Sequence, residues 1–496
     1  MPNPKSLPFI PAAALIFTSL AAAQTSTPPP ARPSYQERLQ RLLNPAPGAW
    51  SADQLATMAH LRDAAIHDSY ALDELRHLTD NIGPRISGSP QAAHAVEYVA
   101  VEMRALGAEV HLEKTMVPHW VRGAETAELV SWPGQTPGTT QKIVLTALGG
   151  SGATPPNGVQ AEVLVVNSFD ELRQLPLATV KGKILLFNEH FDKQLAANGD
   201  GGAAYGKAVV YRGAGPTLGK SLGAAAVLVR SVGGADYRLP HTGATFASED
   251  GPQIPSGAVT AEDANLLANL ARQGPITMHL TLTPQSLPKV ESYNVVADWK
   301  GTEHPEQFVI VSGHLDSWDL GTGAIDDGAG VAVSMQVIHL LKHLGVHPRR
   351  TVRFVAWMDE EQGTEGGRDY AIAHAHDVAN HIAAIESDLG AGHPTGFFFV
   401  GKPDLEEFMR PVAHVLDGIN AGVMKSATEA GADVDPMNQK GVPGFAPIQD
   451  ARFYFNYHHT PADTFDKVDP RELSENAAVM TVLAYALADS PTPAPR

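Results

Sequence analysis

The stretch that decides the fold is QFVIVSGHLD (residues 307–316), in which an apolar run leads directly into polar residues. The aromatic and β-branched residues of Gln307–Ser312 predict a buried β-strand. His314 and Asp316 follow where that strand ends, and Asp316 is placed to accept the second ring N–H of His314. The stretch therefore predicts a strand that delivers a metal-binding type of side chain to the edge of a sheet.

Two later strands end in the same way. Thr351–Met358 runs into Asp359-Glu360-Glu361, and His381–Ser387 leads to Asp388. In an open α/β sheet the ligand crevice lies at the carboxyl ends of the parallel strands, so we expect these side chains to meet at one edge. Because Glu360 and Glu361 are adjacent, one can bind a metal while the other takes a proton from water.

A pair of aspartates lies in a loop between two of these strands. Asp326 and Asp327 belong to the loop Gly323–Gly328, just before a helix that we expect over Val331–Leu344. The N-terminus of a helix favours ionised carboxylates, which are good metal ligands. The register of the motif favours Asp326 as the ligand, with Asp327 as the alternative.

The chain has 496 residues and no cysteine, which excludes disulfides, thiolate zinc sites, cysteine nucleophiles and iron–sulfur clusters. Any metal site must therefore use His, Asp and Glu. A further histidine, His459, follows a short strand that we expect over Arg452–Asn456. Five ligands of the types His, Asp, Glu, Asp and His suit two zinc ions when one carboxylate bridges them. His314, Asp388 and His459 are three candidates, and the loop aspartates and the glutamates Glu360 and Glu361 offer the other two.

Composition and charge narrow the class of protein. Apolar residues make up 43% of the chain and charged residues 18%, as in globular proteins. The length corresponds to roughly two to four domains. With 54 acidic and 36 basic residues the formal charge is −18, which argues against a nucleic-acid partner.

The N-terminal residues have the features of a secretory signal. Residues 1–23 combine Lys5, an apolar stretch and the small residues Ala21-Ala22-Ala23, and a proline-rich linker follows over Thr27–Pro33. No other run is long and apolar enough to span a membrane. We expect an exported bacterial protein, periplasmic or extracellular, with no membrane span in the mature chain.

The remaining chain divides into three parts that differ in composition and in the pattern of apolar residues. Residues 24–123 form a first part of the main domain, with Ser89 before a proline as the N-cap of a helix. Residues 124–290 are rich in Gly and Ala with short apolar runs such as Lys207–Tyr211, which indicates an inserted β-rich module. In residues 291–490 strands and helices alternate, as in an α/β fold.

Three motifs that suggest other sites are rejected. AGPTLGKS (214–221) has an alanine in place of the first glycine of a phosphate-binding loop and a proline inside it. His339 and His343 have the spacing of a zinc-binding helix, but the run HLLKH lacks the required glutamate. His374 and His376 are interpreted as solvated side chains.

The quoted motifs resemble those of the co-catalytic dinuclear zinc exopeptidase family, of the leucyl aminopeptidase and glutamate carboxypeptidase type. The resemblance rests on GHLDSWDLGTGAIDDGAG (313–330), WMDEEQGTEGG (357–367), ESDLGAG (386–392) and HHTPADTFDKVDP (458–470). TDNIGPRISGSP (79–90) and MVPHWVRG (116–123) point to the same subgroup. It implies a mixed central sheet flanked by helices, with residues 124–290 as a protease-associated-like domain.

The resemblance also implies a role for each site residue. His314 and Asp388 would bind one zinc ion, and Glu361 and His459 the other. Asp326 would bridge both ions and be followed by a cis peptide bond to Asp327.

Two further roles concern catalysis. Glu360 would be the general base, and Asp316 would orient His314. Some relatives have a tyrosine beside the ligand histidine that stabilises the oxyanion. This chain has His458 there, so His458 and Tyr457 are both candidates.

The implied activity is zinc-dependent hydrolysis of short peptides or dipeptides by an exopeptidase, and the implied assembly is a homodimer. Since an acidic chain does not attract an anionic C-terminal glutamate, the charge favours an aminopeptidase or dipeptidase. The alternatives are a carboxypeptidase of the glutamate carboxypeptidase type and a non-catalytic, receptor-like binding protein.

Overall fold

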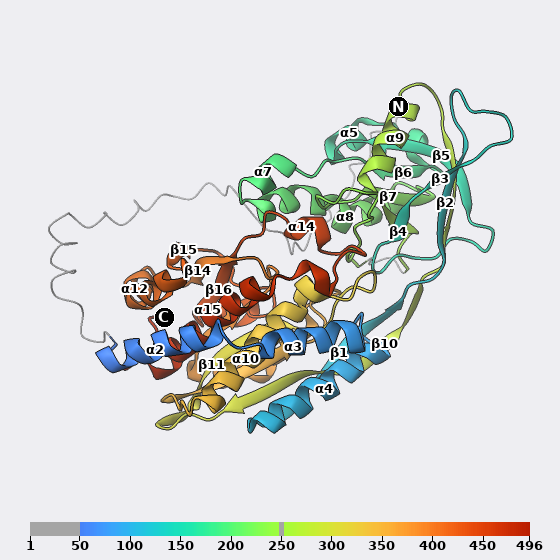
Figure 1. Cartoon of the computed structure of the whole chain (residues 1–496). Coiled ribbons are helices and arrows are strands. Elements are labelled where there is room, and N and C mark those ends of the chain that lie inside the picture. Colours follow the sequence, from blue (N-terminus) through green and yellow to red (C-terminus); the bar gives the residue numbers. More distant parts are fainter. Residues whose placement is uncertain (1–49, 248–251) are drawn as a thin grey trace, which may run out of the picture. The chain divides into compact units, whose positions relative to one another are not determined.

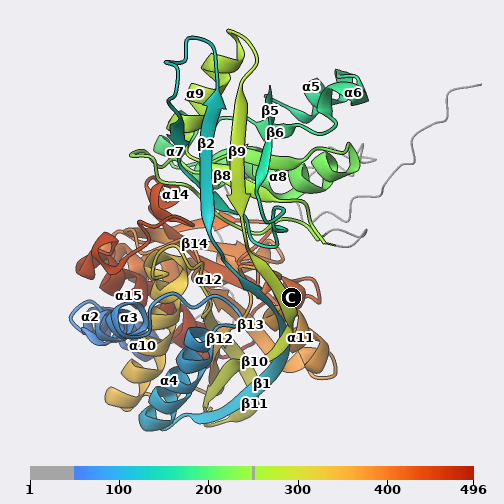
Figure 2. The same ribbon diagram turned by 90° about the vertical axis from the view of Figure 1, so that its right-hand side faces the viewer.

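The computed structural model describes residues 50–247 and 252–496, which contain two eight-stranded sheets (Figures 1 and 2). The expected signal peptide and proline-rich linker lie outside the described residues. Within residues 50–247 and 252–496, no helix combines the length and hydropathy that a membrane span requires.

The first sheet is mixed and carries the strands predicted from the sequence. Its order is β1 (Glu109–Val121), β10 (Gln285–Trp299), β12 (Arg350–Trp357), β11 (His304–His314), β13 (His381–Glu386), β16 (Gly444–Gln449), β14 (Pro394–Val400) and β15 (Val423–Ser426). The strands β12, β11, β13 and β16 are parallel to one another, and β1 and β10 pair with antiparallel neighbours. At the other edge β14 is antiparallel to β16 and parallel to β15. His314 pairs with Trp357, and Ser312 pairs with Glu386, so the three predicted strands end at the same edge.

Side chains of the central strands alternate between two hydrophobic cores, as the period of two requires. Val309 and Val311 lie in the core that contains most of the helices, and Ile310 lies in the core on the opposite face. All three are fully buried. A sheet that is buried on both faces explains why the sequence shows continuous apolar runs here.

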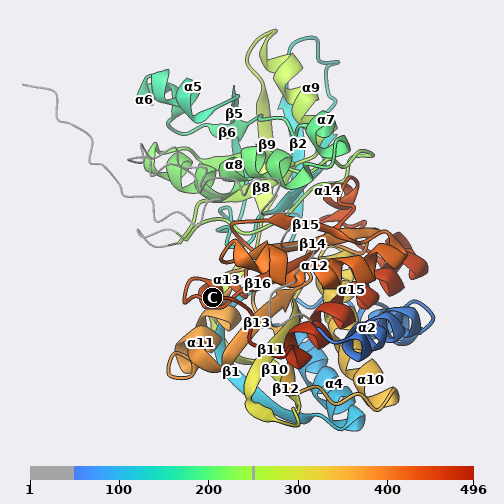
Figure 3. The same ribbon diagram turned by 90° about the vertical axis from the view of Figure 1, so that its left-hand side faces the viewer.

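Helices cover both faces of this sheet, and Figure 3 shows α11 and α13 on one side of the strands and α15, α10 and α4 on the other. The larger group comprises α2 (Ala52–Ala65), α3 (Tyr70–Arg76), the π-helical turn η1 (His77–Ile82), α4 (Pro90–Leu106), α10 (Ala329–His343), α12 (Asp404–Leu416) and α15 (Pro470–Asp489). The other face carries α11 (Glu365–Ala373) and α13 (Asp435–Asn438). The N-terminal α2 packs against the C-terminal α15.

Local signals in the sequence explain where several of these helices begin. The side chain of Ser51 caps α2 and forms a reciprocal capping box with Gln54. Ser89 accepts the N–H of Ala92 at the start of α4, as predicted, and Pro90 is the first helical residue. Asp469 caps the long helix α15 in the same way.

The second sheet lies entirely within the segment between β1 and β10. Its order is β3 (Gln141–Ile143), β2 (Glu125–Ser131), β9 (Thr277–Leu282), β5 (Val159–Val166), β6 (Ile184–Phe187), β7 (Ala226–Arg230), β8 (Ser256–Val259) and β4 (Leu145–Ala147). Its helices are α5 (Phe169–Gln174), α6 (Leu177–Val180), α7 (Lys193–Ala197), α8 (Gly201–Ser221) and α9 (Ala261–Ala271).

Two local predictions were wrong. Lys207–Tyr211 belongs to α8 and not to a strand. Glycines lower the helix propensity of this segment, but they let it pack closely on the sheet. A Cβ at Gly219 would lie 2.3 Å from Val227 of β7. The expected strand Arg452–Asn456 instead contains the start of a one-turn helix, α14 (Tyr454–Tyr457).

Candidate metal centre

The five predicted ligand residues lie together at the carboxyl edge of the first sheet. His314 is the last residue of β11, Glu361 lies in the turn after β12, and Asp388 lies two residues beyond β13. Asp326 belongs to the π-helical turn η2 (Ala324–Gly328) before α10, and His459 follows α14. Strand ends therefore position three of these residues, and the turns before α10 and after α14 position the other two.

Asp326 is the centre of this cluster because its two oxygens face different groups. Its Oδ1 lies 3.2 Å from His314 Nε2, and its Oδ2 lies 3.2 Å from His459 Nε2. Asp388 Oδ1 lies 3.3 Å from the same nitrogen of His314. Glu361 Oε2 lies 2.8 Å from His459 Nε2. The cluster thus consists of two neighbouring sets of nitrogen and oxygen atoms that share one carboxylate.

Asp327 has a different environment. Its Oδ2 accepts the N–H of His314 at 3.0 Å, and its Oδ1 accepts the N–H of Gly330 at 3.0 Å. The peptide bond between Asp326 and Asp327 is cis, as the resemblance implied. Because both oxygens of Asp327 are engaged by backbone groups, Asp326 is the better placed ligand.

The atoms of this cluster fit a cation. Asp326 Oδ2 and Glu361 Oε1 are buried and accept no hydrogen bond from the part of the chain that the structure describes. Buried carboxylate oxygens without a donor are costly unless a cation or a proton compensates them. Imidazole nitrogen and carboxylate oxygen are the ligands that zinc uses where no thiolate is present.

The second sheet contributes the group that orients His459. Thr242 lies in the segment between β7 and β8, and its carbonyl oxygen is 3.2 Å from His459 Nδ1. The backbone N–H of Thr242 donates to the His459 carbonyl at 2.9 Å. With Nδ1–H donating to this carbonyl, a metal-bound His459 would use the lone pair of Nε2, the nitrogen that faces Asp326 and Glu361. Arg212 of α8 donates to the same Thr242 carbonyl at 3.2 Å.

Asp316 acts on a different target from the one predicted. The nitrogen Nδ1 of His314 lies 3.0 Å from the backbone carbonyl of Asp316, whereas the nearest carboxylate oxygen is 3.8 Å away. The carboxylate instead accepts the N–H groups of Asp359, Glu360 and Glu361 at 2.8, 3.1 and 3.3 Å. Asp316 therefore holds the turn that carries Glu360 and Glu361.

The carboxylates and histidines of the cluster shift one another's pKa. Burial, followed by Asp326, raises the pKa of Glu361 to about 7. Against the effect of burial, Glu361 and Asp326 raise the pKa of His459 to about 9. Burial raises the pKa of Glu360 well above its usual range, and the nearby carboxylates of Asp388 and Glu361 add to the effect. Bound cations would neutralise the negative charge of these closely spaced carboxylates.

The two oxyanion candidates differ in position. His458 is buried and stacks on His459, with its Nε2 3.5 Å from Asp326 Oδ2. Tyr457 is only partly buried, and its ring lies 5.7 Å from the ammonium nitrogen of Lys467. The structure therefore brings His458, but not Tyr457, against the cluster.

Hydrogen bonds fix the tautomer of His458. His241 donates from Nδ1 to the Thr242 carbonyl at 3.0 Å, which leaves its Nε2 as an acceptor. That Nε2 lies 3.0 Å from His458 Nδ1, so the Nδ1 of His458 carries the proton. Burial, together with His459, lowers the pKa of His458 well below its usual range. Neutral His458 consequently presents a lone pair, and no N–H, to the cluster.

Comparisons with known proteins agree with the geometry. The model of Peptidase family M28 matches residues 294–484. Carboxypeptidase Q of Homo sapiens is 38% identical over 426 residues, which cover 86% of each chain. Aminopeptidase YwaD of Bacillus subtilis is 23% identical over 86% of each chain. The crystal structure of a Peptidase M28 precursor from Shewanella amazonensis is similar with a TM-score of 0.82 and 33% identity, covering 89% of this chain and 98% of that one.

The chain belongs to peptidase family M28. Both the family predicted from the motifs and the mixed α/β fold are thereby confirmed. As a member of M28 the protein is a zinc metallopeptidase, a hydrolase that acts on peptide substrates.

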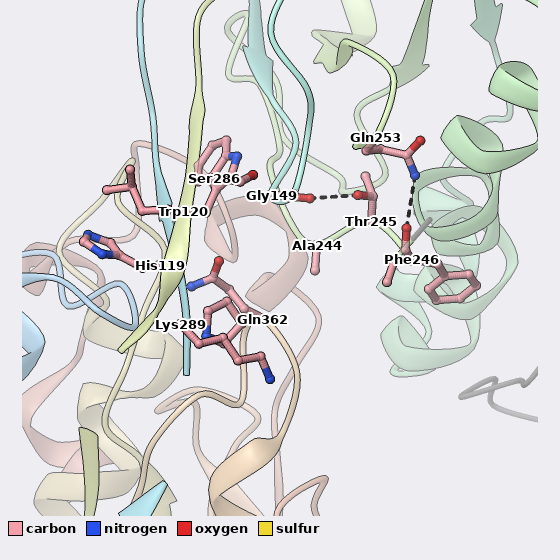
Figure 4. A pocket seen from close by; sticks show the side chains of 14 residues that line it. His119, Trp120, Gly149, Ala244, Thr245, Phe246, Gln253, Ser286, Lys289 and Gln362 are labelled. Atoms are coloured by element: carbon pink, nitrogen blue, oxygen red, sulfur yellow. Dashed lines mark hydrogen bonds between the residues drawn. The ribbon is translucent and has the colours of Figure 1, made fainter. Parts of the chain in front are cut away.

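A cavity of about 310 Å³ is lined by residues of both parts of this M28 peptidase, and none of the five candidate ligands is among them (Figure 4). Gln362, which follows Glu361 in the chain, is part of its wall, and so is Trp120. Trp120 packs against Trp318 with ring centroids 6.4 Å apart, and Trp318 packs against His459 at 5.8 Å. The opposite wall comes from the second sheet, with Ala244, Thr245 and Phe246 among its residues.

Two buried residues that support the M28 site were missed as site residues in the sequence. Arg85 is fully buried and donates to the carbonyls of Leu315, Thr322 and Gly323, among others. Asp463 accepts the N–H groups of Ala324 and Ile325 at 2.8 Å. Both fix the loop before Asp326. Their signal was present, since each lies inside a motif quoted for the family.

Tyr454 is a third missed residue. It is buried, and its ring lies 4.9 Å from that of His458, four residues later. Burial raises the pKa of Tyr454 well above its usual value, and the carboxylates of Asp326 and Asp388 act in the same direction. Its hydroxyl therefore remains protonated near the cluster. Residues four apart lie on the same side of a helix, so a helix here would have placed Tyr454 beside His458. The strand expected over Arg452–Asn456 did not place them together.

Proposed function

We propose that this chain is a two-zinc exopeptidase. His314 and Asp388 would hold one ion, Glu361 and His459 the other, and Asp326 would bridge them. The observation that carries the proposal is the division of the two Asp326 oxygens between His314 and His459, each at 3.2 Å. Zinc, when bound, acidifies water and polarises the scissile carbonyl.

Glu360 is the general base of this proposal. It takes a proton from the attacking water and returns it to the leaving amine. The three N–H bonds to Asp316 keep the turn in place, so that Glu361 faces His459 and Glu360 remains available for proton transfer. General acid–base catalysis of this kind contributes roughly 10²–10⁴-fold to rate.

Tyr454 is the oxyanion donor that the geometry supports. An oxyanion requires a hydrogen-bond donor, and neutral His458 offers a lone pair on its Nε2 instead. The neutral hydroxyl of Tyr454 can donate, and its ring lies beside His458. This assignment replaces the two candidates expected from the sequence, His458 and Tyr457.

The cavity drawn in Figure 4 would hold one side of the substrate. Its walls combine aromatic residues with amides, and Gln362 Nε2 is buried without a partner among the described residues. We place a substrate residue in this cavity with its peptide bond at the metal centre. The charge of −18 favours substrates with a free amino group, hence an aminopeptidase or dipeptidase.

A carboxypeptidase is the second candidate. It is favoured by the 38% identity to relatives named Carboxypeptidase Q over most of the chain.

The remaining proposals are that residues 124–290 form an inserted protease-associated-like domain, that the protein is exported from a bacterial cell, and that it forms homodimers.

The test is to remove the metal with a chelator, restore zinc, and assay dipeptides with free, N-acetylated or C-amidated ends. We expect chelation to abolish hydrolysis, zinc to restore it, and N-acetylation to block it. Hydrolysis of N-acetylated but not C-amidated dipeptides would assign a carboxypeptidase instead. Zinc-independent hydrolysis, or none with any substrate, would overturn the proposal.

A further inference from the structure

A second group of metal-binding side chains lies at the other end of β13. His381 begins this strand, and Asp388 of the candidate metal centre follows its far end. His374 lies directly after α11, and Asp377 lies between the two histidines in the chain. Figure 3 shows α11 beside β1, and the two elements are in contact. A strand of this length separates the two groups by roughly 20 Å, at about 3.3 Å per residue.

Asp377 faces both histidines. Its Oδ1 lies 3.3 Å from His374 Nδ1 and 3.9 Å from His381 Nδ1. The three donor atoms lie within 4.8 Å of one another. These separations are close to those between ligands that share a zinc ion with bonds of about 2.0–2.2 Å.

The other nitrogen of each ring has a partner of its own. His374 Nε2 lies 3.0 Å from Glu113 Oε1 of β1. His381 Nε2 lies 2.8 Å from the hydroxyl of Tyr370, which also accepts a hydrogen bond from Arg353 at 3.0 Å. Histidines that bind metals commonly have such an outer partner, which fixes the ring and its tautomer. His374 Nδ1 therefore faces the Asp377 carboxylate, whereas His381 Nδ1 lies 3.3 Å from the backbone carbonyl of Asp377 and 3.9 Å from its carboxylate, so a metal would replace that backbone bond.

The carboxylates around His374 favour a cation, whereas the guanidinium of Arg353 acts against a positive charge on both histidines. Each nitrogen of His374 faces a carboxylate, Glu113 on one side and Asp377 on the other. Despite burial, His111 and His374 lower the pKa of Glu113 to about 2, so this carboxylate stays ionised. A divalent cation would replace a proton between His374 and Asp377. The side chains of His374 and Asp377 are 15% and 20% exposed, which leaves access for the ion and for a water ligand.

We propose that His374, Asp377 and His381 form a separate site for one divalent transition metal of the zinc type, with water as the fourth ligand. The ligands are Nδ1 of each histidine and Oδ1 of Asp377. The metal would connect the end of α11 to the start of β13, and through Glu113 to β1. This site corrects the interpretation of His374 as a solvated side chain, whereas His376 is exposed as expected.

The test compares the metal content of the full-length wild type with that of Asp377→Asn, a nearly isosteric change. Both proteins are saturated with zinc, passed through gel filtration and analysed for zinc by mass spectrometry. We expect the variant to hold one zinc ion fewer per chain with kcat and KM unchanged. The result is the zinc content of the wild type minus that of the variant, so it does not depend on how many ions the catalytic centre holds.

Two further variants complete the test. His374→Gln should also lose one ion, which guards against a folding defect peculiar to Asp377→Asn. His376→Gln should keep the wild-type zinc content, because this neighbouring side chain is exposed and bonds to the Ala373 carbonyl. Equal zinc content in the wild type, Asp377→Asn and His374→Gln would overturn the proposal.

Discussion

At the scale of single residues, the carboxylate of Asp326 would allow five side chains to serve two cations in the proposed two-zinc site. Its oxygens face His314 and His459 separately, while both oxygens of its neighbour Asp327 are engaged by backbone N–H groups. Two adjacent aspartates thus have different tasks: one is free to bind metal, and the other fixes the backbone around it.

Tyr454→Phe tests the oxyanion donor. The change removes one hydroxyl near the cluster and leaves the ring in place, so we expect folding and zinc content to be unchanged. Loss of one oxyanion donor typically lowers kcat by roughly 10²–10³-fold. Steady-state kinetics with a dipeptide substrate should show this loss in kcat, with little change in KM.

Tyr457→Phe is the matched control. This tyrosine is three residues away, and its ring lies near Lys467 at the surface. Its loss should leave kcat within about twofold of the wild type. The assignment of Tyr454 fails if the two variants have the same kcat, or if Tyr457→Phe is the slower enzyme.

At the scale of elements, the turn after β12 depends on Asp316 at the end of β11. Asp316→Asn replaces a carboxylate oxygen by an amide that cannot accept from the turn. We expect the turn to shift and kcat to fall by roughly 10²-fold, because small misplacements of catalytic groups have effects of this size. Ser87→Ala, which removes only the hydroxyl bonded to Asp316 at 2.9 Å, should reduce kcat much less. Similar kcat values for the two variants would contradict the role of Asp316.

Helices α3 and α4 meet at a buried carboxyl group, Glu74, which accepts a hydrogen bond from Tyr98 at 2.7 Å. Burial, followed by Glu102, raises the pKa of Glu74 to about 7. A raised carboxyl pKa stabilises the fold below the unfolded pKa of about 4.5, and this contribution is lost as the pH rises through 7.

Glu74→Gln should therefore be more stable than the wild type at pH 8, by up to about 3 kcal/mol, with a much smaller difference near pH 4.5. Glutamine keeps an acceptor for Tyr98 and carries no charge. Urea unfolding at the two pH values measures the difference. Glu97→Gln, at an exposed position of α4, should show no such dependence on pH. A Glu74→Gln variant that gains nothing at pH 8 would contradict the prediction.

At the scale of the whole molecule, both sheets contribute to one site. The first sheet supplies the side chains, and the second supplies the Thr242 carbonyl that orients His459 and one wall of the cavity. This division explains why the sequence predicted one half of the site and missed the other. His314, Glu361 and Asp388 follow apolar strands, so a local pattern reveals them. Thr242 acts through its backbone carbonyl, which every residue has, so the sequence does not reveal this role.

The errors in the fold have a similar origin. Gly215 and Gly219 make α8 an unfavourable helix by local propensity, but they allow it to contact Phe187 and Val227 of the second sheet at distances that a Cβ would prevent. Packing between distant segments decides the structure there. The strands of the first sheet were predictable because their apolar runs are long and both of their faces are buried.

The most direct test of the central claim is the kcat of Glu360→Gln, measured together with its zinc content. Glutamine has nearly the same shape as glutamate but cannot accept a proton from water. We expect wild-type zinc content and a kcat lower by roughly 10²–10⁴-fold, the contribution of general acid–base catalysis. A variant that retains its zinc and hydrolyses dipeptides at the wild-type rate would contradict this claim.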